Sequence, residues 1–305
     1  MRHLLQIVRP TNVLIIAASQ WLIYYLYVIP LMQQHHIERL LTGALVPLFI
    51  SVTALIAAGS YVINDIKDLQ ADQHNKPNKT YIGPDKLTIC TAQSYYYLLT
   101  ALGAGIAIYI ALTIDKPWLF VIYPAAVSAL YAYSASWKRR PLSGNIVVAV
   151  YCAFVPGIIW YAEADGMAAL YRVAPAYILL FAAYILFGFL ATLVRELVKD
   201  IEDLAGDSAA GYRTYAVVRG LAPTRRLAVG VLVLLISSYG LWLLAIWRLG
   251  SIVELSVCIL AILVPSIYLL QQLMVASSPP AYTALSRQLK WLMIASLVVF
   301  CIVLW

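Results

Sequence analysis

The stretch Asn64-Asp65-Ile66-Lys67-Asp68-Leu69-Gln70-Ala71-Asp72 follows directly on an apolar run, Leu45 to Ile63. If the helix predicted for that run continues, the three aspartates lie at i, i+3 and i+7 on one helical face. Carboxylates at the end of a membrane-grade helix are costly to place there, which favours a functional role for them. Stacked like charges repel unless a cation lies between them, and Mg²⁺ is usually held by a few carboxylates together with substrate phosphates. The stretch therefore predicts a magnesium site formed by Asp65, Asp68 and Asp72.

Neighbouring residues extend this candidate site toward a ligand that carries phosphate. Asn64 and Asp68 lie at i and i+4, so their side chains can share one ligand. Lys76 and Lys79, just behind the motif, supply positive charge for a phosphate group. The alternative is a solvated loop after a helix, in which Lys67 and Lys76 simply balance the negative charge.

A second acidic stretch repeats the pattern far down the chain. Asp200, Asp203 and Asp207 have the same i, i+3, i+7 spacing, and they again follow an apolar run, here Pro175 to Leu193. Two acidic helix ends of this kind, over a hundred residues apart, favour a two-sided clamp for metal ions and a diphosphate.

Charged residues just ahead of the second motif have more than one interpretation. Arg195 and Lys199 are candidates for binding an anion, but a Lys199–Asp203 pair at i, i+4 is also an ordinary helix salt bridge of about 0.2–0.5 kcal/mol. Glu196 lies on the same face as the aspartates and deeper in the span. It could be a metal ligand, a partner of Arg195 or a base.

The composition indicates an integral membrane protein. Of the 305 residues, 63% are hydrophobic and 11% are charged, whereas a soluble domain is usually about 25% charged. A net charge of +7 could indicate nucleic-acid binding, but basic residues that mark cytoplasmic loops explain it better, and we expect no nucleic-acid partner. Four scattered cysteines without C-x-x-C spacing favour neither a disulfide frame nor a metal centre.

The apolar runs predict an all-α protein, a polytopic membrane bundle of nine transmembrane helices. A spanning helix needs roughly 20 apolar residues, and these runs are continuous rather than alternating as in a barrel. The spans are expected near residues 11–31, 41–63, 88–112, 118–136, 145–162, 173–194, 226–247, 251–273 and 289–305. We expect a single transmembrane domain, residues 1–305. Because the second motif follows the first by four helices, two pseudo-repeated halves are expected, about 1–143 and 144–305.

The distribution of Lys and Arg predicts the orientation. With the amino terminus in the cytoplasm, 17 of the 21 basic residues fall in inner segments, as the positive-inside rule requires. The four outer ones are Arg39, Lys116, Arg172 and Arg248. Both acidic motifs then lie at inner helix ends. Intramembrane carboxylates also mark ion-coupled membrane transporters, but the sites of such carriers cluster near the bilayer midplane.

Basic and aromatic side chains elsewhere are further candidates for substrate contacts. Lys138 and Arg139 end the fourth span, either as a topology signal or as cations where an anionic head group docks. Arg213, after the second motif, is either a phosphate contact or a surface charge. Tyr131 is one of several aromatic residues that could stabilise a carbocation by a cation–π contact.

The two motifs together resemble the signatures of a known family. Asn64-Asp65-x-x-Asp68-x-x-x-Asp72 resembles the first signature of the UbiA superfamily of intramembrane prenyltransferases, and Asp200-x-x-Asp203-x-x-x-Asp207 resembles the second. Nine spans and motifs at cytoplasmic helix ends agree with this resemblance. Within the superfamily, residues 75–79, 138–145 and 195–207 and Tyr131 resemble the digeranylgeranylglyceryl phosphate synthase branch.

The resemblance implies a prenyltransferase, an enzyme of isoprenoid lipid biosynthesis in the cell inner membrane, with its active site facing the cytoplasm. The implied donor is a polyprenyl diphosphate, expected to carry a geranylgeranyl group, and the implied acceptor is (geranylgeranyl)glyceryl phosphate. An aromatic, quinone-type acceptor is the alternative. By the same resemblance, the six aspartates hold Mg²⁺, which assists ionisation of the diphosphate. The residues expected to bind substrate are Asn64, Lys76, Lys79, Lys138, Arg139, Tyr131, Arg195, Lys199 and Arg213.

Overall fold

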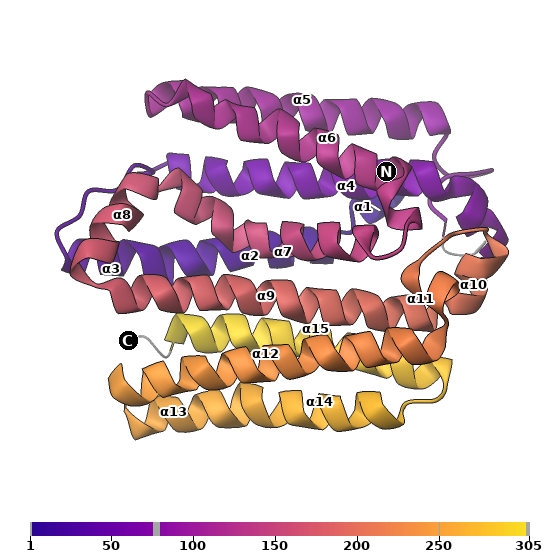
Figure 1. Cartoon of the computed structure of the whole chain (residues 1–305). Helices are drawn as coiled ribbons and strands as arrows, with labels where there is room; N and C mark the ends of the chain where they lie inside the picture. Colours follow the sequence, from indigo (N-terminus) through magenta and orange to yellow (C-terminus); the bar gives the residue numbers. More distant parts are fainter. Residues whose placement is uncertain (1, 76–79, 250, 303–305) are drawn as a thin grey trace. The chain divides into compact units, whose positions relative to one another are not determined.

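A computed structural model describes residues 2–75, 80–249 and 251–302 of the chain. Within these ranges the chain is helical, apart from short connections and one isolated bridge between Ile82 and Leu87 (Figure 1). The expected all-α class is confirmed. Helices suit a bilayer because each backbone polar group there must be satisfied within its own segment.

Nine helical runs within the described residues are long and apolar enough to cross a membrane, which confirms the predicted number. They are Pro10–Gln34, Leu45–Leu69, Ile89–Thr113, Pro117–Arg139, Ser143–Ala162, Pro175–Glu202, Leu221–Leu244, Ile252–Val275 and Pro279–Cys301. The ninth begins at Pro279 rather than near residue 289. Arg287 and Lys290 interrupt the apolar pattern there without interrupting the helix.

Shorter helical segments flank or interrupt several spans. In chain order the elements are α1 (Arg2–Ile7), α2 (Pro10–Ile23), η1 (Tyr24–Val28), α3 (Ile29–Gln34), α4 (Leu45–Asn75), α5 (Ile89–Thr113), η3 (Pro117–Val121), α6 (Ile122–Ala135), η4 (Trp137–Arg139), α7 (Ser143–Ala162), α8 (Ala164–Val173), α9 (Pro175–Glu202), α10 (Leu204–Ala209), α11 (Tyr215–Arg219), α12 (Leu221–Leu249), α13 (Ile252–Cys258), η5 (Ile259–Leu263), α14 (Val264–Val275) and α15 (Pro279–Ile302). The segments η1 and η5 are π-helical, a form that usually occurs as short bulges inside α-helices.

The two helices that carry the acidic motifs end differently. Helix α4 continues unbroken through the first motif to Asn75, as predicted, so positions 65, 68 and 72 keep the spacing of one helical face. Helix α9 ends at Glu202, where Asp203 takes φ −92° and ψ 5°. Asp207 therefore lies on the separate short helix α10. The unbroken helix predicted through the second motif is therefore wrong, although Asp207 still lies close enough to Asp200 for their charges to interact.

The chain forms two compact units, of which the first contains Met1–Trp21 and Arg39–Lys138. Here α4 packs against α5 and α6. The loop after α4 folds back on this core, because Ile82 and Leu87 are buried in one cluster with residues of α4 and α5. Tyr123 Oη donates to Thr100 O over 2.6 Å, and it lies 2.5 Å from where a Cβ on Gly103 would be. A larger residue at position 103 would require the Tyr123 ring to shift.

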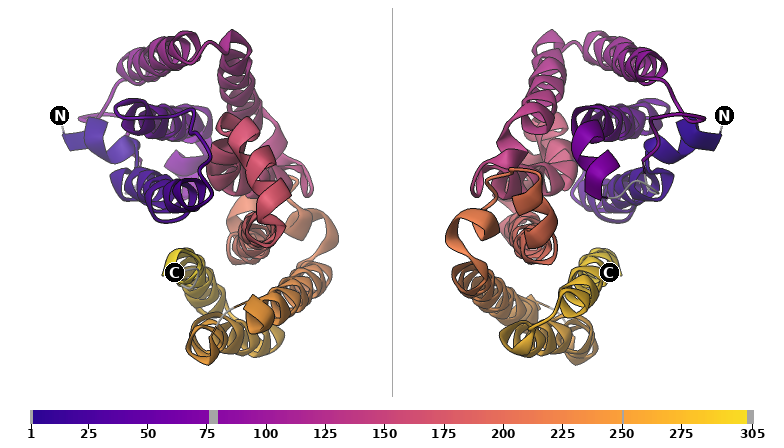
Figure 2. Two further views of the ribbon diagram at one scale, coloured as in Figure 1. Left: turned by 90° about the vertical axis from the view of Figure 1, so that its left-hand side faces the viewer. Right: turned by 90° about the vertical axis from the view of Figure 1, so that its right-hand side faces the viewer.

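The second unit contains Leu22–Glu38 and Arg139–Trp305. Helix α9 packs against α7, α12 and α15, and α14 packs against both α12 and α15 (Figure 2). Lipid tails are as apolar as leucine, so close packing and buried hydrogen bonds stabilise such contacts more than exclusion of water does. Tyr24 Oη donates to Glu163 Oε1 over 2.6 Å, and Tyr27 Oη donates to Tyr177 O over 2.5 Å. These bonds tie η1 to the α7–α8 junction and to the start of α9.

The two pseudo-repeated halves remain a prediction. The chain passes from the first unit to the second between Lys138 and Arg139, near the expected boundary at residues 143 and 144. However, the second unit also includes Leu22–Glu38. Compactness alone is no measure of whether the two halves share a fold.

Candidate active site

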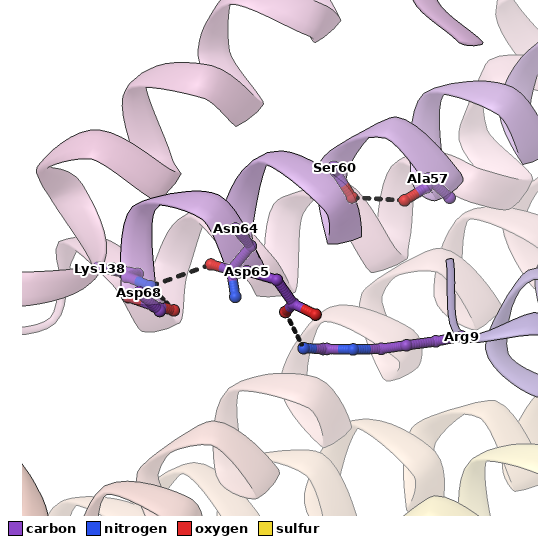
Figure 3. Close-up of polar contacts among 7 residues, drawn as sticks. All are labelled: Arg9, Ala57, Ser60, Asn64, Asp65, Asp68 and Lys138. Atoms are coloured by element: carbon purple, nitrogen blue, oxygen red, sulfur yellow. Dashed lines mark hydrogen bonds and ion pairs between the residues drawn. The ribbon is translucent and has the colours of Figure 1, made fainter. Parts of the chain in front are cut away.

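The first acidic site lies at the carboxyl end of α4 in the first unit, and its aspartates bind different cations (Figure 3). Arg9 Nη2 donates to Asp65 Oδ1 over 2.8 Å. The guanidinium also lies 4.8 Å from the centre of the Tyr61 ring, one helical turn before Asp65. Arg9 occupies the break between α1 and α2 with a φ of +52°, a conformation that is rare for residues other than glycine. The surrounding contacts therefore hold Arg9 toward the motif.

Lys138 from η4 completes this site. Its Nζ donates to Asn64 Oδ1 over 3.0 Å and to Asp68 Oδ2. Both side chains of the Lys138–Asp68 pair are largely buried. Lys138 is about seventy positions away from Asn64 and Asp68 in the sequence. The fold brings all three predicted residues together near the end of α4 (Figure 3).

The remaining candidates near the first motif have different outcomes. Asp72 belongs to α4, but its side chain, like all of Lys76 and Lys79, lies outside the described residues. Tyr131 on α6 contacts Lys67, whose Nζ lies 4.9 Å from its ring centre. Its side chain is 42% exposed. Among the described side chains, Tyr131 has no contact with Asp65 or Asp68, and its role in binding substrate stays a prediction.

The second acidic site lies in the second unit, along the face of α9 that meets α7. Asn145 Nδ2, in the first turn of α7, donates to Asp200 Oδ2 over 3.1 Å. Two further positions on these helices, Cys152 and Thr192, also lie beside one another. The two helices are antiparallel, so Asn145 faces Asp200 at one level of the interface and Cys152 faces Thr192 about two turns away. Asp200 is thus held by a neutral amide, whereas both first-site contacts come from cations.

The cations predicted for the second site are directed at Glu196. Arg195 Nη1 donates to Glu196 Oε1 over 3.0 Å, and Lys199 Nζ donates to the same oxygen over 3.5 Å. The alternative pairing of Lys199 with Asp203 is not among the ion pairs of the described residues. Arg195 Nε is buried without an acceptor in the described part of the chain. Its guanidinium therefore keeps donors for another anion.

The other candidates of the second unit lie beyond the end of α9. The backbone runs on from Asp203, whose carbonyl accepts from Asp207 N over 2.9 Å. Arg139 lies 5.1 Å from the Tyr212 ring centre, and its carbonyl accepts from Arg213 N over 3.0 Å. Arg139 is thus packed beside the segment that follows the motif. The side chain of Arg213 is exposed.

The donor chemistry of these sites suits Mg²⁺. Within the described ranges, no group of three or more His, Cys, Asp or Glu side chains is arranged to hold a metal ion. Mg²⁺ rarely uses such a cage, since one or two carboxylates, several waters and substrate phosphates normally complete its octahedron. Asp65 with Asp68, and Asp200 with Asp203, provide carboxylates of this kind at helix ends. The residues fit a metal that arrives together with a phosphate ligand.

An apolar cavity in the second unit is separate from the acidic site. It has a volume of about 390 Å³ and is lined by α9, α12, η5 and α15. On α9 its lining includes Leu180, Ala183, Tyr184 and Phe187. At 3.6 residues per turn these positions lie roughly half a turn around the helix from Glu196. The cavity and the polar residues therefore face opposite sides of α9.

Comparison with known proteins identifies the family. The model of the UbiA prenyltransferase family matches residues 25–294, a range that includes both acidic motifs. The chain belongs to the UbiA prenyltransferase family. This confirms the family that the sequence indicated. Members of the UbiA family generally use a divalent metal, in keeping with the carboxylates described above.

Several similar proteins are digeranylgeranylglyceryl phosphate synthases. The one from Sulfurisphaera tokodaii is 32% identical over 188 residues, which is 61% of each chain. The one from Hyperthermus butylicus is 33% identical over 240 residues, or 77% of this chain and 74% of that protein. The one from Methanobrevibacter smithii is 27% identical over 84% of this chain and 87% of that protein. The match to the first of these relatives spans about three fifths of its length.

A solved structure has the same fold. It comes from a study of digeranylgeranylglyceryl phosphate synthase in membranes, and it superposes with a TM-score of 0.68 at 20% identity. The match covers 99% of this chain and 97% of that one. Together with the nine spans, it supports the fold expected of a UbiA family protein.

Sequence reasoning missed two contacts in the sites of this UbiA family member. Arg9 is separated from Asp65 by more than fifty residues, and no pattern in the sequence connects them. Asn145 could have been identified as a site residue from the sequence, because a polar side chain in the first turn of a spanning helix needs a partner. Its partner, Asp200, could be identified only from the packing of α7 on α9.

Proposed function

We propose that this protein transfers a geranylgeranyl group from its diphosphate to the free hydroxyl of (geranylgeranyl)glyceryl phosphate, forming an ether. The single observation that carries the proposal is the family match over residues 25–294. It is supported by relatives that are digeranylgeranylglyceryl phosphate synthases. The placement of two acidic motifs at the ends of membrane-spanning helices supplies a chemical basis.

The carboxylates are proposed to hold Mg²⁺ for the donor diphosphate. The ligands are Asp65, Asp68 and Asp72 from the first motif, and Asp200, Asp203 and Asp207 from the second. When bound, Mg²⁺ neutralises the charge that develops on the leaving diphosphate. The acidic sites at the ends of α4 and α9 provide oxygen donors without any cysteine or histidine, the combination that hard cations prefer.

The basic residues of the first site are proposed to bind the diphosphate directly. Lys138 and Arg9 already contact the two carboxylates, so an anion beside those carboxylates lies within reach of both cations. Asn64 holds Lys138 in place. Lys76, Lys79 and Arg213 are proposed as further diphosphate contacts from the sequence alone. Preorganised charges of this kind stabilise a leaving group most where water is excluded.

The acceptor is proposed to bind near Arg195 and Lys199. A glyceryl phosphate carries a dianionic head group that needs cations, and Arg195 retains a donor without an acceptor in the described residues. Arg139 is a further candidate for this role, together with Tyr131 as a contact to the prenyl group. The surrounding spans shield the allylic cation from water, which would otherwise consume it.

The protein is an integral, multi-pass membrane protein with nine candidate spans in its described residues. We further propose that it resides in the cell inner membrane with both motifs facing the cytoplasm. The excess of Lys and Arg in the segments next to the motifs supports this orientation.

Mass spectrometry of the lipid product tests the proposed function. Purified protein is incubated with Mg²⁺, geranylgeranyl diphosphate and two acceptors side by side, (geranylgeranyl)glyceryl phosphate and an aromatic hydroxybenzoate. The expected product is the doubly geranylgeranylated glyceryl phosphate ether. Prenylation of the aromatic ring alone, or of neither acceptor, would contradict the proposal.

A further inference from the structure

We propose that Glu196 accepts the proton of the acceptor hydroxyl during prenyl transfer. This inference rests on the proposed function and names a residue that diphosphate binding does not use. Glu196 lies on α9 four positions before Asp200, so it shares a helical face with that carboxylate. Four residues of helix rise about 6 Å. Glu196 is therefore one turn deeper in the span than the proposed metal ligand.

The contacts of Glu196 leave one of its oxygens available. Arg195 and Lys199 both donate to Oε1. Within the described residues Oε2 accepts no hydrogen bond, and the side chain keeps 14% of its exposure. A carboxylate with one oxygen anchored and the other open is oriented to receive a proton from a bound ligand.

The position of Glu196 along α9 matches the reacting carbon of a prenyl diphosphate. The diphosphate must lie near the cation-binding carboxylates at the inner helix end, whereas the hydrocarbon tail must lie in the apolar span. The carbon that joins them therefore falls on the interior side of Asp200. The next polar position in that direction is Glu196, and after Thr192 the face becomes apolar.

The residue of α7 that faces this position carries no side-chain hydrogen-bond donor. On α7, Asn145 is opposite Asp200 and Cys152 lies beside Thr192. The same antiparallel register predicts that the α7 residue across from Glu196 is Ala149, which is fully buried. Alanine offers a small side chain without a hydrogen-bonding group, so it does not occupy Oε2. The other charged or titratable groups near Glu196 are Arg195, Lys199 and Asp200 on its own helix and Cys152 on α7.

The proposed step balances atoms and charge. The bond from the prenyl C1 to the diphosphate oxygen breaks, and its electron pair leaves with the diphosphate. A lone pair of the acceptor hydroxyl oxygen forms the new bond to C1. The proton of that hydroxyl moves to Glu196 Oε2, and Glu196 returns it to water before the next turnover.

A structural role for Glu196 predicts a different pattern of variants. If Glu196 only orients Arg195 and Lys199, glutamine can replace it, because its side-chain oxygen accepts the same hydrogen bonds. A glutamine cannot take up a proton as a base. The comparison of Glu196→Gln with Glu196→Ala therefore separates proton transfer from positioning.

The experiment measures kcat for ether formation with (geranylgeranyl)glyceryl phosphate, using the full chain in detergent with Mg²⁺. Binding of a non-ionising thio analogue of the donor diphosphate reports whether each variant is folded. We expect Glu196→Gln and Glu196→Ala both to lose about 100-fold or more in kcat, the usual contribution of general acid–base catalysis. Glu196→Asp retains a carboxylate and is expected to lose less. The affinity for the donor analogue should stay within about twofold of wild type.

The matched control is Glu202→Gln. Glu202 is on the same helix, and its Oε1 accepts from Thr283 Oγ1 over 2.8 Å, so the control should keep wild-type turnover. Glu196→Gln within about threefold of wild type would overturn the proposal, and so would a large loss in Glu196→Ala alone. If wild type forms no ether, the proposed function fails and this inference fails with it. If wild type forms ether but Glu196→Gln does too, only this inference fails.

Discussion

The two acidic motifs have the same spacing in the sequence, but the structure surrounds them with different partners. In the first, Asp65 is bound by Arg9 and Asp68 by Lys138, so each carboxylate has a cation of its own. In the second, Asp200 is bound by the neutral amide of Asn145. The nearby cations, Arg195 and Lys199, are directed at Glu196 instead. Equal spacing therefore does not mean equal electrostatics.

This difference indicates that the two motifs have different roles. Cations that already neutralise the first pair of aspartates must compete with an incoming metal ion for those carboxylates. Asp200 is hydrogen-bonded by the amide of Asn145 instead, and Lys199 acts on it only through its nearby charge. We infer that the first motif contributes mainly through cations that contact diphosphate, and that the second contributes mainly through carboxylates that bind metal.

The largest effect is expected from removing the cation of the first site. Lys138→Ala should lower kcat/KM for the donor by at least about 30-fold, because loss of one member of a desolvated charge pair costs about 2 kcal/mol or more. Lys138→Arg keeps a cation at this position and should recover part of the lost kcat/KM. Lys116→Ala, in the connection between α5 and η3, is the matched control. Unchanged donor kinetics in Lys138→Ala would remove the proposed role of the first motif.

The amide of the second site gives a sharper test of the comparison. Asn145→Ala removes one donor to Asp200 and should lower the free energy of unfolding by about 1 kcal/mol. Asn145→Asp also places a like charge against Asp200. Without metal, its free energy of unfolding should therefore fall by about twice as much as that of Asn145→Ala. Added Mg²⁺ should restore part of the stability of Asn145→Asp. Equal stabilities of the two variants at all Mg²⁺ concentrations would show that Asp200 carries no charge in that setting.

Competition with Mg²⁺ distinguishes the motifs directly. Arg9→Ala removes a partly exposed cation, and an ion pair of that kind contributes about 1 kcal/mol or less. The concentration of Mg²⁺ that gives half-maximal turnover should therefore fall by up to about fivefold. Arg195→Ala should leave this concentration unchanged, since Arg195 contacts Glu196 rather than an aspartate. Equal shifts in both variants would contradict the distinction.

The smallest effect concerns the segment after the second motif. Tyr212→Leu removes the ring beneath Arg139 and should lower the free energy of unfolding by about 0.5–1 kcal/mol, the value of an exposed cation–π contact. Tyr212→Phe keeps the ring face and should lose less stability than Tyr212→Leu. Thermal unfolding in detergent can rank the two. A larger loss in Tyr212→Phe than in Tyr212→Leu would assign the effect to the hydroxyl.

The fold was largely predictable because hydropathy alone marks helices that must satisfy their backbone inside a bilayer. The predicted helix boundaries were wrong where charged residues lie inside a helix and where a helix ends inside a charged motif. Arg287 and Lys290 hid the start of α15, although a helix tolerates both residues. The end of α9 at Glu202 was not visible either, since the spacing of Asp200, Asp203 and Asp207 suits an unbroken helix equally well.

The candidate site was predictable where chemistry is local and unpredictable where it depends on distant contacts. Asn64, Asp65 and Asp68 follow from spacing on one helix. The contact between Arg9 and Asp65 depends on the interruption between helices α1 and α2, where Arg9 has a positive φ. The contact between Asn145 and Asp200 depends on how α7 packs against α9. Neither is encoded in a short motif.

The most direct test of the account compares ether formation by wild type, Asp68→Ala and Asp200→Ala, with Mg²⁺ and with a chelator. Asp115→Asn, an exposed acidic position between α5 and η3, serves as the control. The account predicts that mass spectrometry detects the ether product only for wild type and the control, and only with Mg²⁺ present. Turnover near the wild-type rate in either aspartate variant, or without any divalent cation, would contradict it.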